Sequence, residues 1–106
     1  LKLAQENNTA SKQIFEEIIL SKNKFYSVLA LGSILDNDLE KSKVKILDYF
    51  KIVEDMSLSK VQKDLLIFKK ALYLIKTSEV EKGNELLKKL IEKDSKYKSL
   101  AQDFLN

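Results

Sequence analysis

The sequence predicts an all-α fold, built as a stack of antiparallel helical hairpins with about six helices in one domain over residues 1–106. Three observations support this prediction. The chain contains no Pro and only two Gly, so few residues would interrupt a helix. Apolar side chains recur at helical spacing, and no stretch alternates with the period of two that is typical of a strand. The joins between periodic segments are short, so consecutive helices should be antiparallel neighbours.

The first half of the chain predicts three helices, over residues 2–20, 25–35 and 39–54. The polar segment SKNK (21–24) interrupts the apolar periodicity between the first and the second helix. The segment DND (36–38) follows the second helix and contains residues that favour turns. Asp and Asn are also good N-cap residues, so this segment is expected to begin the third helix.

The second half predicts three more helices, over residues 59–77, 80–93 and 96–105. A polar loop precedes the fourth helix, and either Ser57 or Ser59 could cap it. Short polar links then separate the fourth, fifth and sixth helices, as expected for hairpins.

Charge is spread along the chain rather than concentrated. The net charge is +3, and 19 cations are interleaved with 16 acids. Such a mixture is typical of a solvated surface. The alternative is nucleic-acid binding, which would place the Lys clusters on one face. Those clusters are Lys41, Lys43 and Lys45; Lys69 and Lys70; Lys88 and Lys89; and Lys93, Lys96 and Lys98. All cations are Lys, whereas bidentate contacts to bases and phosphates favour Arg.

The composition argues against catalysis. Without Cys or His the chain has no thiolate nucleophile, no histidine base and no His ligand for zinc. The segment Asp36-Asn37-Asp38 resembles the start of a calcium loop, but the Gly and the distal Glu of such a loop are missing. We therefore expect no enzyme, no cofactor, no metal site and no small-molecule substrate.

A short sequence pattern occurs twice. YSVLA at residues 26–30 nearly returns as YKSLA at residues 97–101, which predicts two helices with the same packing. Small residues also recur, because Ala30 precedes Ser42 by twelve positions and Ala71 precedes Gly83 by twelve. Two helices can cross closely only where side chains at the contact are small, so both pairs predict a close crossing within a hairpin.

These patterns resemble the tetratricopeptide repeat, a helix-turn-helix unit with large and small positions in its first helix and a small one early in its second. Tyr26, Leu29, Ala30 and Ser42 follow that order, and Ile67, Ala71 and Gly83 follow it again. The resemblance implies a tetratricopeptide-like stack of hairpins.

The resemblance is closest to the YfgM-like family of membrane-anchored bacterial envelope proteins, on the segments FYSVLALGSILDND (25–38) and DSKYKSLAQDFL (94–105). It implies a domain excised from a longer chain with an upstream membrane segment, on the periplasmic side of the inner membrane. It also implies a non-catalytic protein-protein interaction scaffold, an accessory to protein translocation or periplasmic chaperoning. A cytoplasmic location, a Lys-driven nucleic-acid-binding domain, and a purely structural or self-associating helical domain are the alternatives.

The fourth helix contains the most apolar stretch, LLIFKKALYLI (65–75). A helix that is apolar nearly all round is buried on several sides or binds a partner. Aligned with the repeat, one set of side chains lines an apolar groove for a protein partner or a second copy of the chain: Leu31, Ile34, Leu65, Phe68, Leu72 and Ile75. The alternative is that flanking helices of a closed bundle cover Leu65, Phe68 and Leu72.

Overall fold

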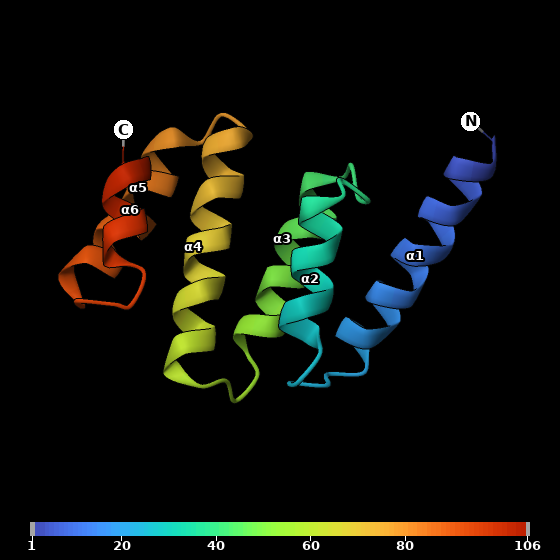
Figure 1. The fold of residues 1–106 in the computed structure, drawn as a ribbon, viewed down its shortest axis with the longest axis horizontal. Coiled ribbons are helices and arrows are strands. Elements are labelled where there is room, and N and C mark those ends of the chain that lie inside the picture. The colour runs from blue at the N-terminus through green and yellow to red at the C-terminus, as the bar shows by residue number, and fades with distance from the viewer. Residues whose placement is uncertain (1, 106) are drawn as a thin grey trace. The chain divides into compact units, whose positions relative to one another are not determined.

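The computed structural model describes the backbone of residues 2–105 and the side chains of residues 8–105. Within this range it contains α-helices and no strand (Figure 1). The helices are α1 (Lys2–Leu20), α2 (Ser27–Asp36), α3 (Lys43–Glu54), α4 (Lys60–Lys76), α5 (Val80–Glu92) and α6 (Lys98–Phe104). The prediction of an all-α fold with about six helices is therefore confirmed.

The chain divides into two compact units, residues 1–57 and 58–106. The first unit holds α1, α2 and α3, and the second holds α4, α5 and α6. Each unit is described by itself below. The prediction of one domain over residues 1–106 stays a prediction.

Serine side chains begin two of the helices. The hydroxyl of Ser59 accepts the N–H of Gln62 at 3.2 Å, and the Gln62 side chain accepts the N–H of Ser59 at 3.1 Å, which makes a capping box for α4. Of the two predicted caps, Ser59 is thus the one used. At α3 the hydroxyl of Ser42 accepts the N–H of Lys45 at 3.3 Å.

The predicted start of the third helix was wrong by four residues, because α3 begins at Lys43 rather than at residue 39. Asp38 does not cap it. Its backbone takes a left-handed conformation, with φ 52°, directly after the end of α2. There the N–H of Leu39 reaches back to the carbonyl of Ile34 at 3.0 Å, so these residues finish α2 instead of starting α3.

The same helix ending recurs without glycine. Lys22, Ser78 and Asp94 also have positive φ, at 59°, 72° and 52°, each two residues past the end of a helix. After α4, the N–H of Glu79 donates to the carbonyl of Leu74 at 2.8 Å. These bonds satisfy carbonyls that the helix leaves open, and they turn the chain sharply enough for short joins.

In the first unit α1 and α2 form the main hairpin, and α3 packs on both (Figure 1). Ser27 begins α2 fully buried, and its hydroxyl donates to the carbonyl of Ile18 on α1 at 3.3 Å. Among the side chains of this unit that the structure describes, the buried apolar ones are Ile19, Val28, Ala30, Leu31, Ile34, Ile46, Tyr49, Phe50 and Val53.

In the second unit α4 packs closely on α5 at Gly83. A Cβ atom at this position would lie 2.5 Å from Cγ1 of Ile75 and 2.7 Å from the carbonyl oxygen of Ala71. No side chain fits there, so the close crossing predicted for Ala71 and Gly83 is confirmed.

The matching pair in the first half is placed differently, and its predicted close crossing stays a prediction. Ser42 lies outside α3 as its N-cap, whereas Gly83 lies inside α5. The join between α2 and α3 spans residues 37–42 and that between α4 and α5 spans 77–79. The longer join places Ser42 before the first turn of α3, whereas the shorter join places Gly83 within the first turn of α5. The same spacing of twelve residues therefore gives different positions relative to the two helices.

The two copies of the Tyr-x-x-Leu-Ala pattern begin equivalent helices. Tyr26 and Tyr97 are the N-cap residues of α2 and α6, and each accepts the N–H of the alanine four residues later at 2.8 Å. Ala30 and Ala101 are 2% and 0% exposed. Both copies thus bury a small residue. In each case the residue lies on the second helix of a hairpin, which is α1–α2 for Ala30 and α5–α6 for Ala101.

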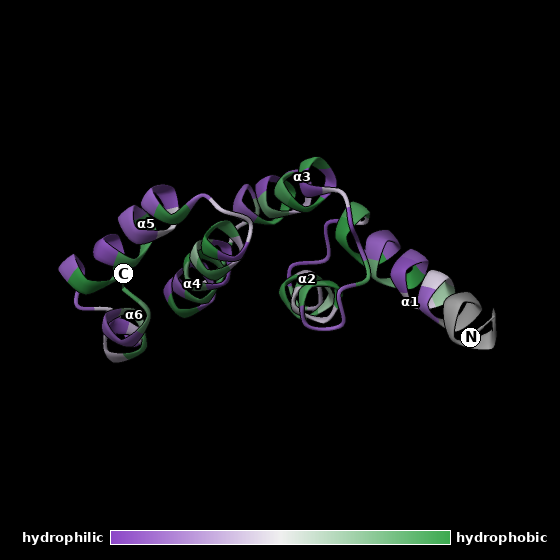
Figure 2. Cartoon of the chain, turned by 90° about the horizontal axis from the view of Figure 1, so that it is seen from above, coloured by the Kyte–Doolittle hydropathy of each residue, from purple (hydrophilic) through white to green (hydrophobic). Residues whose placement is uncertain are grey.

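The tyrosine rings differ. Tyr97 stacks on Phe68 with 6.1 Å between ring centroids, while Tyr26 is 59% exposed. The prediction that the two helices pack alike therefore holds for the buried alanines but not for the tyrosine rings. Hydropathy colouring shows polar and apolar faces along α3, α4 and α5 and a mostly apolar α2 (Figure 2).

Candidate protein-binding surface

The predicted groove residues of the first unit are buried. Leu31 and Ile34 lie on α2, and each is 0% exposed. In this conformation neither side chain offers surface to a partner. Both belong to the apolar interior of the unit, where their helix packs on α1.

The predicted groove residues of the second unit lie on α4 and have mixed environments. Phe68 is 9% exposed, because the rings of Tyr97 and Phe104 pack on it from the α6 segment. Ile75 lies against Gly83 at the crossing with α5. Leu65 and Leu72 are half-buried. The groove as a binding site stays a prediction, and α6 covers its central residue.

Sequence analysis missed an apolar surface around that central ring. Leu100 and Phe104 on α6 are 47% and 48% exposed. They are four residues apart and so share a face of α6, and the Phe104 ring meets Phe68 edge-on at 5.8 Å. Leu65 and Leu72 lie about one turn to either side of Phe68 on α4. The signal was available: Leu100 and Ala101 are both apolar, yet adjacent helical residues cannot face the same neighbour.

We call these residues the α4–α6 apolar surface: Leu65, Phe68, Leu72, Leu100 and Phe104. All belong to the second unit. Phe68 also belongs to the core cluster of the unit, together with Ala71, Leu87, Leu90 and Ala101. The surface therefore rests on close-packed side chains and is held by two helices.

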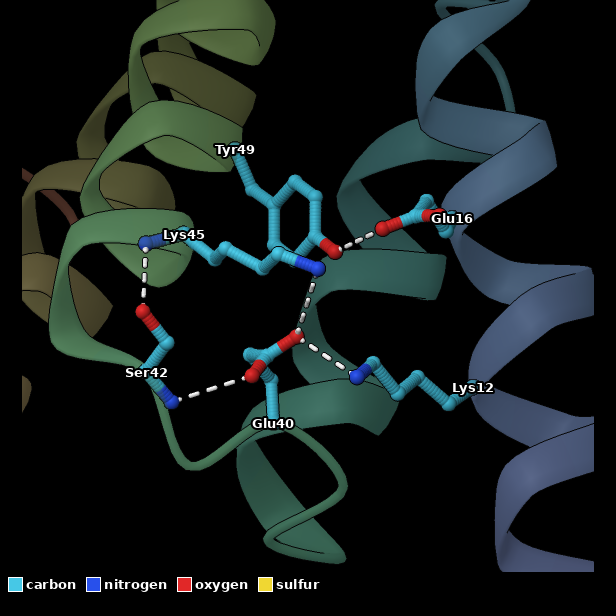
Figure 3. Close-up of polar contacts among 6 residues, drawn as sticks. All are labelled: Lys12, Glu16, Glu40, Ser42, Lys45 and Tyr49. Atoms are coloured by element: carbon cyan, nitrogen blue, oxygen red, sulfur yellow. Dashed lines mark hydrogen bonds and ion pairs between the residues drawn. The ribbon is translucent and has the colours of Figure 1, made fainter.

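A carboxylate organises the polar contacts of the first unit. Glu40, in the join between α2 and α3, is 8% exposed and lies between Lys12 of α1 and Lys45 of α3 (Figure 3). The Lys12 ammonium is 2.9 Å from its Oε1, Lys45 is 4.0 Å from the same atom, and the N–H of Ser42 donates to Oε2 at 3.0 Å.

Burial alone would raise the pKa of Glu40. The hydrogen bonds and charges of Lys12, Ser42 and Lys45 outweigh burial and leave that pKa below its ordinary value. Oε1 is buried and accepts no hydrogen bond of standard geometry, but the Lys12 ammonium 2.9 Å away compensates its charge. Glu40 is thus a charged tether that joins α1 to the start of α3.

Tyr49 makes the second contact of this cluster. Its hydroxyl donates to the carboxylate of Glu16 on α1, and the residue is 4% exposed (Figure 3). Burial raises the pKa of Tyr49, and the hydrogen bond and negative charge of Glu16 raise it further. The phenol is therefore held neutral as a hydrogen-bond donor between α3 and α1.

A second buried carboxylate holds the second unit together. Asp64 of α4 is 2% exposed, with the Lys93 ammonium 2.7 Å from Oδ1 and the Ser95 hydroxyl donating to Oδ2 at 2.8 Å. The Ser95 oxygen in turn accepts the N–H of Tyr97 at 3.1 Å. Burial raises the pKa of Asp64, but Lys93 and Ser95 lower it more, so it lies below its ordinary value. The network fixes the segment that carries α6.

Several members of the predicted Lys clusters pair with acids. Lys41 contacts Asp38, Lys93 contacts Asp64, and Lys98 lies 3.3 Å from Asp94. Such pairs reduce the positive charge that these lysines present to a phosphate backbone.

Among the residues that the structure describes, no group of three or more His, Cys, Asp or Glu side chains is arranged for a metal ion. No helix in the same residues is both long and apolar enough to cross a bilayer. No family model matches the chain, and neither a curated protein nor a solved structure is significantly similar to it.

Proposed function

We propose that this chain is a non-catalytic protein-protein interaction scaffold that binds its partner through the α4–α6 apolar surface. One observation carries the proposal. Leu100 is 47% exposed, and it lies in the chain between Tyr97 and Phe104, whose rings both pack on Phe68. Large apolar side chains held together on a firm base favour binding of a partner's apolar face.

The rigidity of this surface supports binding over simple solvent exposure. The Asp64 network fixes the start of the α6 segment through Ser95 and the N–H of Tyr97. Gly83 allows α4 and α5 to approach closely, so α4 has little freedom to shift. A surface that is already ordered loses less conformational entropy when a partner binds.

We further propose that the scaffold works in the bacterial cell envelope, on the periplasmic side of the inner membrane. The support is the resemblance of residues 25–38 and 94–105 to the YfgM-like family. This part of the proposal predicts an apolar segment of about 20 residues upstream in the full-length gene. A full-length protein that fractionates with the cytosol would contradict it. Accessory work in translocation or chaperoning is the role that the resemblance favours.

The alternative of nucleic-acid binding is weakened by the ion pairs of Lys41, Lys93 and Lys98. It predicts binding to DNA or RNA at low ionic strength that falls steeply with added salt. An electrophoretic mobility assay at low salt tests this directly. Absence of a shifted band would rule the alternative out.

Co-purification tests the proposed surface. We would compare the tagged full-length protein with its Leu100→Ser variant in the cells that produce it, and identify bound proteins by mass spectrometry. Lys88→Ser is the matched control, because Lys88 is an exposed residue on α5 outside the surface. We expect at least one protein to be retained by the wild type and by Lys88→Ser but lost from Leu100→Ser.

Circular dichroism of both variants would show that each remains folded. Retention of the same proteins by all three forms would place the binding surface elsewhere on the chain. Loss from both variants would mean that binding is not specific to the α4–α6 apolar surface.

A further inference from the structure

The turn between α1 and α2 exposes four large apolar side chains within ten residues. Leu20 is 57% exposed, Phe25 71%, Tyr26 59% and Leu29 66%. Leu20 ends α1 and Leu29 lies in the first turn of α2, so all four are within about a helical turn of the tip of the hairpin. This is a different surface from the α4–α6 apolar surface, in the other unit.

The backbone of this turn is held in place although its side chains face solvent. The side-chain oxygen of Asn23 accepts the N–H of Phe25 at 2.9 Å and the N–H of Tyr26 at 3.1 Å. Ser27 follows directly after Tyr26, and its hydroxyl donates a hydrogen bond to the carbonyl of Ile18 on α1. Because these hydrogen bonds fix the backbone of Phe25 and Tyr26, their rings stay exposed instead of packing on the rest of the unit.

The charge of the turn is positive. Residues 18–35 contain Lys22 and Lys24 and no acid. The Lys24 ammonium lies 5.7 Å from the centre of the Phe25 ring, so its apolar stem and the ring lie together while the charge remains exposed.

Both lysines also line a shallow hollow of about 450 Å³ against the end of α3, with Ile52, Asp55, Met56 and Ser57. The acids nearest the turn are Glu17, exposed on α1 three residues before Leu20, and, on the α3 side, Asp55 in the hollow and Glu54 beside it. Lys51 lies one turn earlier on α3. The α3 side is therefore mixed in charge, and the turn itself is purely cationic.

We propose that this turn is a peripheral docking site for the surface of an anionic lipid bilayer. Phe25, Leu20 and Leu29 enter the headgroup boundary, Tyr26 keeps its hydroxyl at the polar level, and Lys22 and Lys24 meet lipid phosphates. Exposed aromatic and aliphatic side chains beside lysines are the combination that favours the bilayer interface. A segment that carries two lysines and no acid between residues 18 and 35 fits an extended anionic surface better than it fits a peptide of mixed charge. The inference goes beyond the scaffold function and does not depend on it.

A single-tryptophan reporter tests the proposal. The chain contains no Trp, so Phe25→Trp introduces the only one, at a side chain that is 71% exposed. Val44→Trp, at a residue that is 79% exposed near the start of α3, is the matched control. Each full-chain variant would be titrated with vesicles of phosphatidylglycerol in phosphatidylcholine and with vesicles of phosphatidylcholine alone.

We expect the emission of Phe25→Trp to shift to shorter wavelength with the anionic vesicles, while Val44→Trp stays unchanged. Replacing Lys22 and Lys24 by Gln in the reporter should weaken binding roughly 10- to 30-fold. Replacing Lys88 and Lys89 by Gln removes the same charge from exposed positions on α5 and should leave binding unchanged.

Three results would overturn the proposal. The first is no emission shift at position 25 with anionic vesicles. The second is an equal loss of binding from the two Lys-to-Gln pairs, which would show attraction by net charge alone. The third is a shift that appears without lipid as protein concentration rises, which would make the turn a contact between two copies of this chain.

Discussion

Asp64 and Glu40 are carboxylates that the described part of the chain buries, and each joins segments that are distant in the sequence. Asp64 reaches Lys93 and Ser95, and Glu40 reaches Lys12. Their charge is retained because cations and donors outweigh the effect of burial on the pKa. At the residue scale, the buried carboxylates of Asp64 and Glu40 thus hold the fold together.

Asp64→Asn should destabilise the protein by about 1–3 kcal/mol, because Lys93 and Ser95 lose a charged acceptor in a buried site. Urea unfolding followed by circular dichroism measures the change. Asp103→Asn removes the same charge from an exposed position on α6 and should change the free energy of unfolding by less than about 0.5 kcal/mol. Equal effects of the two substitutions on the free energy of unfolding would show that the contacts of Asp64 with Lys93 and Ser95 do not stabilise the protein.

The same variant predicts a pH dependence. The folded pKa of Asp64 lies below its ordinary value of about 3.9, so its charged form stabilises the folded state. This contribution is complete above that ordinary value and is lost as the pH falls toward the folded pKa. The difference in stability between wild type and Asp64→Asn should thus be constant near neutral pH and shrink below about pH 4. A difference in stability that grows on acidification would contradict the lowered pKa of Asp64 in the folded state.

At the element scale, the starts of α3 and α4 depend on side chains that are visible in the sequence, whereas the helix ends do not. Ser59 and Gln62 form a capping box that the polar loop before α4 made predictable. Asp38 takes a left-handed conformation after the end of α2. The usual sequence signal for such a helix end is a glycine, and none is present here. For this reason DND was predicted to begin α3, although Ser42 does so.

Ser59→Ala should lower the free energy of unfolding by about 1 kcal/mol, because the first turn of α4 loses its side-chain acceptor. Thermal unfolding by circular dichroism measures this. Ser57→Ala is the matched control, since Ser57 is exposed in the same loop and does not cap the helix. A larger effect at Ser57 would contradict the assigned cap.

Gly83→Ala should also destabilise the protein, by about 1–3 kcal/mol, although alanine is the better helix former. The added methyl would lie 2.7 Å from the Ala71 carbonyl oxygen, and backbone cannot move aside as a flexible side chain does. Lys88→Ala, at an exposed position of the same helix, should have little effect on the same melting curve. A stabilised Gly83→Ala variant would show that α4 and α5 do not approach this closely.

At the scale of the whole chain, periodicity and composition were enough to predict the class of fold and the number of helices. They were not enough to predict which apolar side chains stay exposed. Phe68 fits a groove by its spacing alone, but the rings of Tyr97 and Phe104 cover it. Those contacts join residues that are 29 and 36 positions apart, and no local pattern encodes them.

The two copies of Tyr-x-x-Leu-Ala make the same point. Each begins a helix and buries its alanine, as the shared sequence predicts. The fate of the tyrosine depends on what lies opposite: Tyr97 has Phe68, whereas Tyr26 is exposed. Each unit consequently carries its own exposed apolar surface, one proposed for a protein partner and one for lipid.

Site-specific photo-crosslinking from position 100, in the full-length protein within the cells that produce it, tests the scaffold function most directly. A photoreactive amino acid at position 103 is the control, because Asp103 is exposed on the same helix but is polar. We predict an adduct with one other protein from position 100 and none from position 103. Adducts from neither position, or equal adducts from both, would contradict the claim that the α4–α6 apolar surface binds a protein partner.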